Sequence, residues 1–286
     1  MSRVITVASG KGGVGKTTIT ANLGIALAQR GQRILLIDAD IAMANLSLIL
    51  GMHSSPITLH DVLLGESSIQ DAIYDGPAGI SFVPSGLSLE SYRRVDSERL
   101  EQVVESIKDQ FDFILLDAPA GIEKNVTSCL AASDQVLLVS SPDSPSVADV
   151  LKTKITAQRI GVAPLGIILN FVRGEKGEIP QDDIMKMLEL PLYGVVPFDD
   201  EVRKSFMQEK VQPLILRKPN SPAAIAIRKI AAKLDGMPIE FKNVSSGSFI
   251  GRFFNSLFSI FRRTPKQNVQ NKREEDISED FIKRER

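Results

Sequence analysis

The 286-residue sequence predicts an α/β protein with a doubly wound, mostly parallel sheet. Over roughly the first 240 residues, short aliphatic runs alternate with longer amphipathic segments. The runs are rich in Val, Ile and Leu without polar alternation, as expected for strands buried on both faces. Most of them end next to Gly, Asp, Ser, Asn or Pro, which favour turns. Such sheets bind ligands at the carboxyl ends of their strands, so we expect the site there.

The individual elements follow from these runs in chain order. The expected strands are Val4–Ala8, Ile34–Ile37, Phe113–Leu116, Val136–Val139, Leu165–Leu169 and Tyr193–Val196. The expected helices are Thr17–Arg30, Ser97–Gln110, Val147–Ile160, Pro180–Leu188 and Pro222–Leu234. The first of these helices runs into Gly31, a residue type that commonly terminates helices. Alternating strands and helices predict right-handed crossovers between parallel strands.

Composition excludes several classes of protein. Hydrophobic residues make up 43% and charged residues 24% of the chain, which is typical of a globular protein. No uncharged apolar run reaches the length of about 18 residues that a membrane span needs. The sequence enters a strand-like run at Arg3, so we expect no secretory signal peptide. The single cysteine, Cys129, excludes an internal disulfide and favours a cytoplasmic protein.

Residues 10–17 read GKGGVGKT and fit the phosphate-binding pattern G-x-x-x-x-G-K-[ST]. The motif follows an expected strand and opens an expected helix. Its backbone N–H groups and the helix N-terminus can therefore face phosphate oxygens. Lys16 is expected to reach the β- and γ-phosphates, and the Thr17 hydroxyl to ligate Mg²⁺. The expected nucleotide contacts of this segment are Gly10, Lys11, Gly12, Gly13, Val14, Gly15, Lys16, Thr17 and Thr18.

The loop contains a second lysine, Lys11, which the general pattern does not require. A lysine on the outer side of the loop could serve a nucleotide held by a neighbouring subunit, as an arginine finger does in trans. The alternative is a solvated surface lysine.

Carboxylates follow two of the expected strands. Asp38 and Asp40 come directly after Ile34–Ile37, and Asp117 follows Phe113–Leu116. An Asp after a hydrophobic strand is the usual arrangement for holding Mg²⁺ beside a phosphate loop. One of the first two acids could orient the attacking water, and the other could steady the magnesium shell. Taken alone, each Asp could also be an ordinary turn residue.

Together, three segments resemble the MinD/ParA family of deviant Walker A ATPases, and most closely its MinD branch. These are residues 9–18 (SGKGGVGKTT), residues 38–45 and residues 117–123 (DAPAGIE). The resemblance covers roughly residues 1–263. It implies an ATPase that hydrolyses ATP to ADP and phosphate with Mg²⁺, and whose ATP-bound form is a face-to-face homodimer.

The resemblance also implies roles for particular side chains. Lys11 reaches the partner's nucleotide, and Asp40 positions the hydrolytic water. Asp38 contributes to the hydrolytic and metal environment. Asp117 lies near Mg²⁺, and both Asp117 and Asp40 contact the ion through water. Asn45 lies near the γ-phosphate.

For the adenine, the resemblance points to the ends of two late strands. The matching residues are Asn170, Pro197, Phe198 and Asp199. An Asn amide offers both a donor and an acceptor to a purine edge, although Asn170 could also be a strand-end turn residue. This chain departs from the family where Phe171 and Val172 stand, since many relatives have Arg there.

The C-terminal part has a different pattern. We expect an ATPase domain over residues 1–242, a linker over 243–248, an amphipathic helix over 249–263 and a disordered charged tail over 264–286. The helix carries one broad apolar stripe with cations beside it. Its expected membrane contacts are Phe249, Ile250, Phe253, Phe254, Leu257, Phe258 and Phe261. An in-plane anchor for anionic lipid fits this pattern, and MinD relatives carry one. The alternative is a final helix docked on the domain.

The leading hypothesis is a membrane-associated ATPase that positions cellular machinery, such as the division site. It would lie on the inner face of the cell membrane and act with an activator or cargo protein. The alternatives are a DNA-partitioning ATPase of the ParA type and an ATPase that positions flagella or another polar assembly. Residues 245–286 hold nine basic and six acidic residues, a net charge of +3. The whole chain has a net charge of −1, so residues 1–244 carry a net charge of −4. This balance disfavours nucleic acid as a partner.

Overall fold

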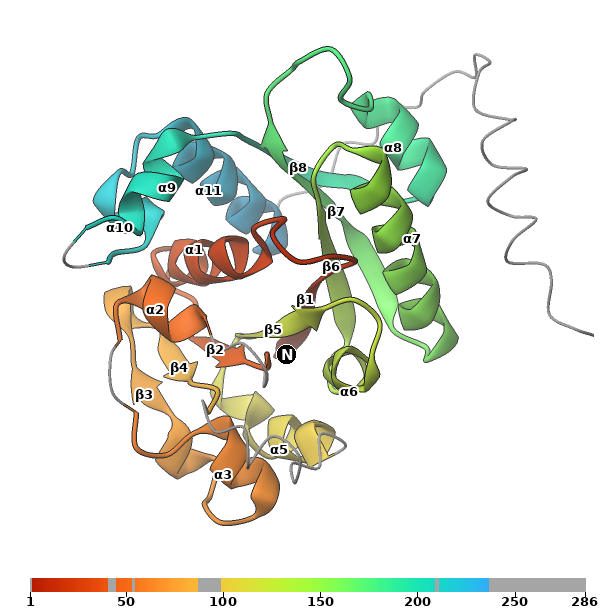
Figure 1. The fold of residues 1–286 in the computed structure, drawn as a ribbon. Helices are drawn as coiled ribbons and strands as arrows, with labels where there is room; N and C mark the ends of the chain where they lie inside the picture. Colours follow the sequence, from red (N-terminus) through yellow and green to blue (C-terminus); the bar gives the residue numbers. More distant parts are fainter. Residues whose placement is uncertain (1, 41–44, 53–54, 87–98, 209–210, 237–286) are drawn as a thin grey trace, which may run out of the picture. The chain divides into compact units, whose positions relative to one another are not determined.

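The computed structural model describes residues 2–40, 45–52, 55–86, 99–208 and 211–236. In this part of the chain, eight strands form one sheet in the order β3-β4-β2-β5-β1-β6-β7-β8 (Figure 1). All neighbouring strands run parallel except β3 and β4. The strands are β1 (Arg3–Ser9), β2 (Ile34–Asp38), β3 (Tyr74–Asp75), β4 (Ser81–Val83), β5 (Phe113–Ala120), β6 (Gln135–Ser140), β7 (Ala163–Val172) and β8 (Leu192–Pro197).

Helices cover both faces of the sheet. On one face lie α1 (Lys16–Ala28), α2 (Leu46–Leu50), α9 (Asp200–Ser205), α10 (Leu214–Arg217) and α11 (Pro222–Leu234). On the other face lie α3 (Leu59–Leu64), α5 (Leu100–Ile107), α6 (Lys124–Ala131), α7 (Ser144–Arg159) and α8 (Gln181–Leu188). Short 3₁₀ turns occupy Gln70–Ala72, Pro77–Gly79 and Lys108–Gln110.

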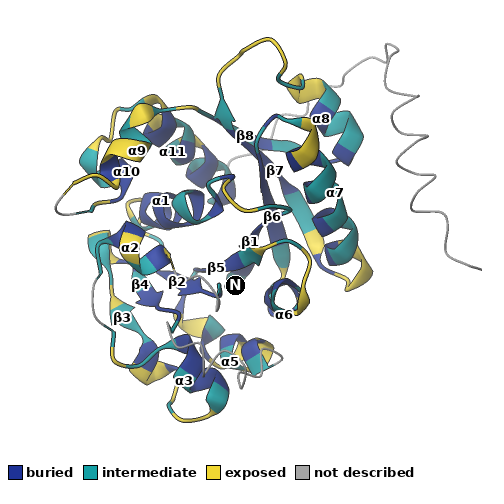
Figure 2. Ribbon diagram, in the orientation of Figure 1, coloured by how far each residue is buried: buried dark blue, intermediate teal, exposed yellow. Residues whose placement is uncertain are grey.

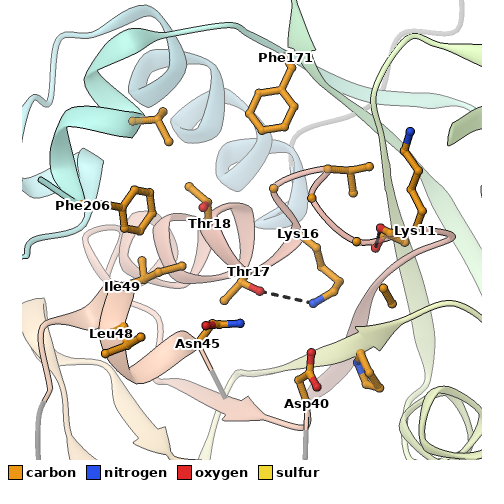
Figure 3. A pocket seen from close by; sticks show the side chains of 18 of the residues that line it. Lys11, Lys16, Thr17, Thr18, Asp40, Asn45, Leu48, Ile49, Phe171 and Phe206 are labelled. Carbon is orange, nitrogen blue, oxygen red and sulfur yellow. Dashed lines mark hydrogen bonds between the residues drawn. The ribbon is translucent and has the colours of Figure 1, made fainter. Parts of the chain in front are cut away.

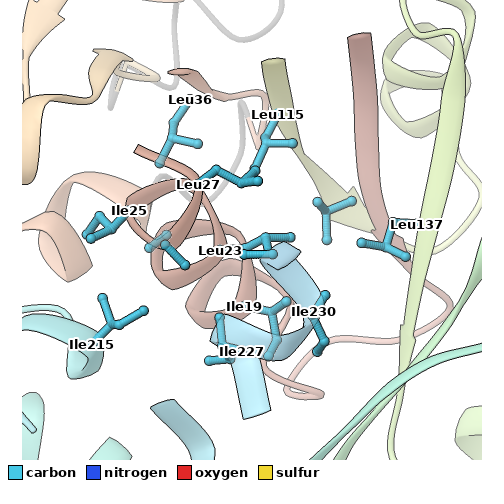
Figure 4. Close-up of a cluster of buried hydrophobic side chains, with 14 of the residues drawn as sticks. Ile19, Leu23, Ile25, Leu27, Leu36, Leu115, Leu137, Ile215, Ile227 and Ile230 are labelled. Carbon is cyan, nitrogen blue, oxygen red and sulfur yellow. The ribbon is translucent and has the colours of Figure 1, made fainter. Parts of the chain in front are cut away.

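The core explains why the central strands lack polar alternation. Successive strand side chains point to opposite faces, and both faces are covered. Leu36 and Leu115 pack toward α1 and α11, whereas Leu35 and Ile114 pack toward α3 and α5. Figure 4 shows the first cluster, with α1 residues such as Leu23 between the sheet and α11. Helix α1 is therefore buried over most of its length, with only Thr17, Thr18 and Ala28 half-buried, and Figure 2 shows it in the interior.

The predicted fold class is confirmed, and each of the six expected strands is present. The helix expected over Pro222–Leu234 has those bounds. Helix α1 ends within two residues of the expected position, and Gly31 adopts a left-handed φ of 89°. Helix α7 begins three residues earlier than expected, because the Asp143 carboxylate accepts a hydrogen bond from the Ser146 N–H and caps the helix.

Several short elements were not predicted. They are β3, β4, α2, α3, α6, α9 and α10. Each has eight residues or fewer, which gives little periodic signal, although α8, also of eight residues, was predicted. The expected helix over Ser97–Gln110 begins at Leu100 and ends as a 3₁₀ turn, with residues 97–98 outside the described part. The linker over 243–248, the amphipathic helix over 249–263 and the tail over 264–286 also lie outside the described residues, so these assignments stay predictions.

Candidate functional site

The glycine loop joins β1 to α1 at the carboxyl edge of the sheet, where the topology places a ligand site (Figure 3). Gly15 has φ of 85°, and a Cβ added there would lie 2.3 Å from Asn170 Nδ2. A Cβ on Gly10 would lie 2.2 Å from the backbone carbonyl carbon of Asp149. By contrast, nothing lies within 4 Å of a Cβ built on Gly12 or Gly13. The ends of the loop are therefore packed against the fold, and its middle is an open cradle.

Lys16 lies at the floor of this cradle. Its side chain is 8% exposed, and Nζ lies 3.0 Å from Oδ1 of Asp117, whose side chain is 1% exposed. Nζ also lies 3.4 Å from the Thr17 hydroxyl, the contact drawn in Figure 3. The Thr20 hydroxyl lies 3.0 Å from both Asp117 Oδ1 and the Lys16 carbonyl oxygen, and its single hydrogen can serve one of them. The fold thus brings Lys16 and Asp117 together in a direct ion pair, and the contact of Asp117 with magnesium stays a prediction.

Asp38 and Asp40 occupy different positions, although they are two residues apart. Asp38 is fully buried, and its two carboxylate oxygens accept hydrogen bonds from the N–H groups of Asp40 (3.2 Å) and Leu46 (3.0 Å). Burial raises the pKa of Asp38 well above its usual range, and the neighbouring charge of Asp117 raises it further. Asp40 and Asn45 line the cavity. Asp38 therefore secures the chain beneath the site, whereas Asp40 can reach a ligand.

Lys11 lies on the loop at the rim of the cavity and is partly exposed. Its side chain is 39% exposed, and Nζ is 3.3 Å from Oδ1 of Asp143. Burial raises the pKa of Asp143, but hydrogen bonds from Ser141, the Ser146 N–H and Lys11 outweigh this effect, so the net pKa is lowered. Exposed pairs of this kind contribute little, roughly 0–1 kcal/mol, to stability. Lys11 can exchange this partner for another anion at small cost.

A cavity of about 900 Å³ opens over the loop. Its polar end is formed by the loop, Thr17, Thr18 and Asp40, and its other end is mostly apolar, although Asp199 and Arg203 also line it. The apolar lining comes from α2, α9 and the ends of β7 and β8: Leu48, Ile49, Phe171, Phe198, Val202 and Phe206. One end thus suits phosphates and the other suits a planar apolar group.

The residues expected near adenine divide into two groups. Phe198 and Asp199 line the cavity. Both carboxylate oxygens of Asp199 are engaged, with the N–H groups of Glu201 (3.0 Å) and Ala223 (3.2 Å), so this side chain also ties α9 to α11. Asn170 is buried beneath the loop and donates from Nδ2 to the Val14 carbonyl oxygen at 2.8 Å. Pro197 is the last residue of β8. Contact of these residues with adenine stays a prediction.

The donor set fits a magnesium nucleotide. The cradle offers backbone N–H groups and the Lys16 ammonium for phosphate oxygens. Among the described residues, no group of three or more His, Cys, Asp or Glu side chains could hold a metal by itself. Mg²⁺ commonly binds through few protein oxygens together with phosphates and water. Here the Thr17 hydroxyl would supply a direct ligand, with Asp40 and Asp117 acting through water.

Comparison with known proteins places the chain in a family. The sequence model of the AAA domain matches residues 2–159. The septum site-determining protein MinD of Pyrococcus horikoshii, solved as a complex with Mg-ADP, is 37% identical, with a TM-score of 0.79 over 82% of this chain and 97% of that one. The chain belongs to the MinD/ParA family of P-loop ATPases. The family resemblance expected from the motifs is therefore confirmed.

Two further proteins are similar to this chain over most of their length. An uncharacterized ATP-binding protein of Methanocaldococcus jannaschii is 44% identical over 259 residues, which are 90% of this chain and 97% of that protein. The MinD of Aquifex aeolicus, solved in complex with MinC, is 32% identical, with a TM-score of 0.75 over 85% of this chain and 100% of that one. The cofactors expected from the sequence, an adenine nucleotide and Mg²⁺, are those held by the horikoshii protein.

Some residues of the site were not predicted. Asp143 and Thr20 were missed because their partners lie 132 and 97 positions away in the sequence. The apolar residues of α2 and α9 were missed because those helices are short. Asp143 did carry a signal, since Asp directly before an amphipathic run with Pro in its first turn is a helix-capping pattern.

Proposed function

We propose that this chain is a Mg²⁺-dependent ATPase that forms a homodimer when it binds ATP and then associates with anionic membrane lipid to position cellular machinery. The observation that carries the catalytic part is the open glycine cradle with the Lys16 ammonium buried at its floor. Asp40, on the cavity wall, is the carboxylate that would orient the attacking water. Asp117 would keep Lys16 and the magnesium shell in place.

Dimerisation in this proposal depends on Lys11 acting in trans. Its exposure and its weak surface pair with Asp143 support the proposal, because little free energy holds the lysine in its own subunit. Lys11→Ala should abolish both ATP-dependent dimerisation and hydrolysis while leaving the fold intact. Sedimentation with Mg-ATP and phosphate release measure the two effects. Lys186→Ala, at a half-buried lysine of α8, is the matched control. ATP-dependent dimers of Lys11→Ala that hydrolyse at the normal rate would contradict the assignment.

Membrane association rests on residues 249–263, which lie outside the described residues. Among the residues that the structure does describe, no helix combines the length and apolar composition of a membrane span. A single in-plane helix binds lipid reversibly, and two helices joined in a dimer would gain avidity, on the order of 10²-fold or more.

Liposome sedimentation tests this step. Vesicles with anionic lipid should retain the full chain with Mg-ATP and release it with Mg-ADP. Removing residues 248–263 should abolish retention, whereas removing the tail over 264–286 should preserve it. ATP-dependent retention without residues 248–263 would refute the anchor. Tight ATP-dependent binding to DNA, without lipid binding, would favour a partitioning ATPase instead.

The partner of the ATP-bound dimer is proposed as a class of protein, an activator or a cargo protein. A MinD relative has been solved in complex with a protein partner, MinC. By analogy, the ATP-bound dimer of this chain would offer its surface to an activator or cargo protein, at the division site or at another polar assembly.

A further inference from the structure

Strand β7 ends in a bulge next to the nucleotide cavity. Between the register pairs Leu169–Val195 and Val172–Pro197, β7 contains two residues where β8 contains one. One of the two, Phe171, has a φ of 60°, in the left-handed region that bulky residues rarely adopt. Bulges redirect side chains and are frequent beside active sites. Strained backbone of this kind clusters at active sites and ligand clamps, so it motivates a functional hypothesis for the side chain that it positions.

The bulge turns two consecutive side chains toward the same target. In a regular strand, Asn170 and Phe171 would point to opposite faces of the sheet. Here a Cβ on Gly15 would lie 2.3 Å from Asn170 Nδ2 and 3.1 Å from Phe171 Cζ. Asn170 is buried and bonded to the loop, whereas Phe171 is half-buried and lines the cavity (Figure 3). The unusual backbone therefore places an aromatic ring where the phosphate cradle meets the apolar end of the cavity.

A second aromatic ring extends this wall. The ring centroids of Phe171 and Phe198 are 6.5 Å apart with the planes tilted by 56°. The Arg173 guanidinium carbon lies 3.4 Å from the Phe198 ring centroid, which braces that ring from the loop after β7. Phe206, directly after α9, lines the same apolar end. Aromatic faces of this kind suit a planar heteroaromatic ring carried on the phosphates.

We propose that Phe171 is a base-binding residue whose ring stacks on the purine of the bound nucleotide, with Phe198 as the adjoining aromatic wall. This inference rests on the proposed nucleotide-binding function and adds the residue that holds the base. Every purine presents a π face, so stacking on Phe171 strengthens binding of purine nucleotides as a class and does not select adenine over guanine.

Calorimetric titration of the full chain can separate the base from the phosphates. The ligands are Mg-ATP, Mg-GTP and magnesium tripolyphosphate, which lacks a base. Phe171→Gly removes the ring and places at φ 60° the residue that adopts it without strain, so the fold is preserved and thermal unfolding checks this. Phe171→Tyr keeps the ring and is the matched control.

The Gly variant should bind ATP and GTP about 10- to 100-fold more weakly than the wild type, and tripolyphosphate within about twofold. The Tyr variant should stay within about threefold of the wild type for all three ligands. An equal loss for tripolyphosphate would overturn the proposal, because the ring would then act by supporting the loop at Gly15. No loss for ATP, or a loss confined to ATP, would also overturn it. If the wild type binds tripolyphosphate as tightly as ATP, the base-binding role of Phe171 is refuted and the proposed function is not. If the wild type binds neither ligand, the proposed function is refuted as well.

Discussion

Substitution of Gly15 tests whether close packing against Asn170 requires a glycine at this position of the loop. In Gly15→Ala, the new methyl group would meet Asn170 Nδ2 at 2.3 Å, on a residue with φ of 85°. The left-handed backbone costs alanine about 1 kcal/mol relative to glycine. Displacing the Asn170 amide breaks its 2.8 Å bond to Val14 and leaves buried polar atoms unpaired, at about 1–3 kcal/mol. The free energy of unfolding should therefore fall by about 2–4 kcal/mol.

Urea denaturation and thermal unfolding measure this loss. The midpoint of thermal unfolding should fall by about 5–15 °C, at about 2–4 °C per kcal/mol for a domain of this size. Gly12→Ala is the matched control, because nothing lies within 4 Å of its added Cβ and its φ is not left-handed. It should change stability by less than about 0.5 kcal/mol. Two variants of equal stability would refute the packing argument.

A double mutant isolates the steric part. The clash requires both side chains, so Gly15→Ala in an Asn170→Ala background should cost only the backbone part, about 1 kcal/mol. An unchanged cost in that background would show that Asn170 is not the obstacle.

Three further predictions concern the carboxylates. Asp117→Asn leaves the Lys16 ammonium buried without a counter-charge and should lower the free energy of unfolding in urea by about 3–5 kcal/mol; a loss below about 1 kcal/mol would refute the ion pair. The pKa of Asp38 is raised in the folded state, so the folded protein keeps a proton that the unfolded chain releases above about pH 4. The stability of the wild type therefore falls as the pH rises from about 4 toward the folded-state pKa of Asp38. Asp38→Asn removes this pH dependence. Between pH 4.5 and 8, the stability of the variant minus that of the wild type should therefore increase with pH. If the two proteins show the same change of stability with pH, the raised pKa of Asp38 is contradicted. Asp143→Ala removes the cap of α7 and should lower the free energy of unfolding by about 1 kcal/mol. If the variant has the same midpoint of thermal unfolding as the wild type, the capping role is excluded.

The central sheet could be predicted from the sequence because burial on both faces leaves a strong local signal. Strands β2 and β5 begin with the uninterrupted apolar runs Ile34–Ile37 and Phe113–Leu116, and helix α11 begins with a Ser-Pro pair. The edge strand β3 and its neighbour β4 have two and three residues, so their positions depend on the pairing of β4 with β2 and of β3 with β4, which no local pattern encodes.

The site could be predicted in its parts and not in its geometry. The motif identified Lys16 and the strand end identified Asp117, but their 3.0 Å pair joins residues 101 positions apart. Asp38 and Asp40 are both expected at the reaction centre from the sequence, yet the chain after β2 buries Asp38 and leaves Asp40 on the cavity wall. The strained backbone of Phe171 had no sequence signal, since such conformations normally favour glycine or asparagine.

The central claim is that the glycine cradle and Lys16 hold the triphosphate of ATP with Mg²⁺. Calorimetric titration of Mg-ATP into the wild type and into Lys16→Met tests it most directly, because Met fills the buried volume without the charge. We expect saturable binding of one nucleotide per chain by the wild type and a loss of at least about 100-fold in the variant, from a charge-assisted contact of roughly 3 kcal/mol. Equal binding by the two proteins would contradict the account.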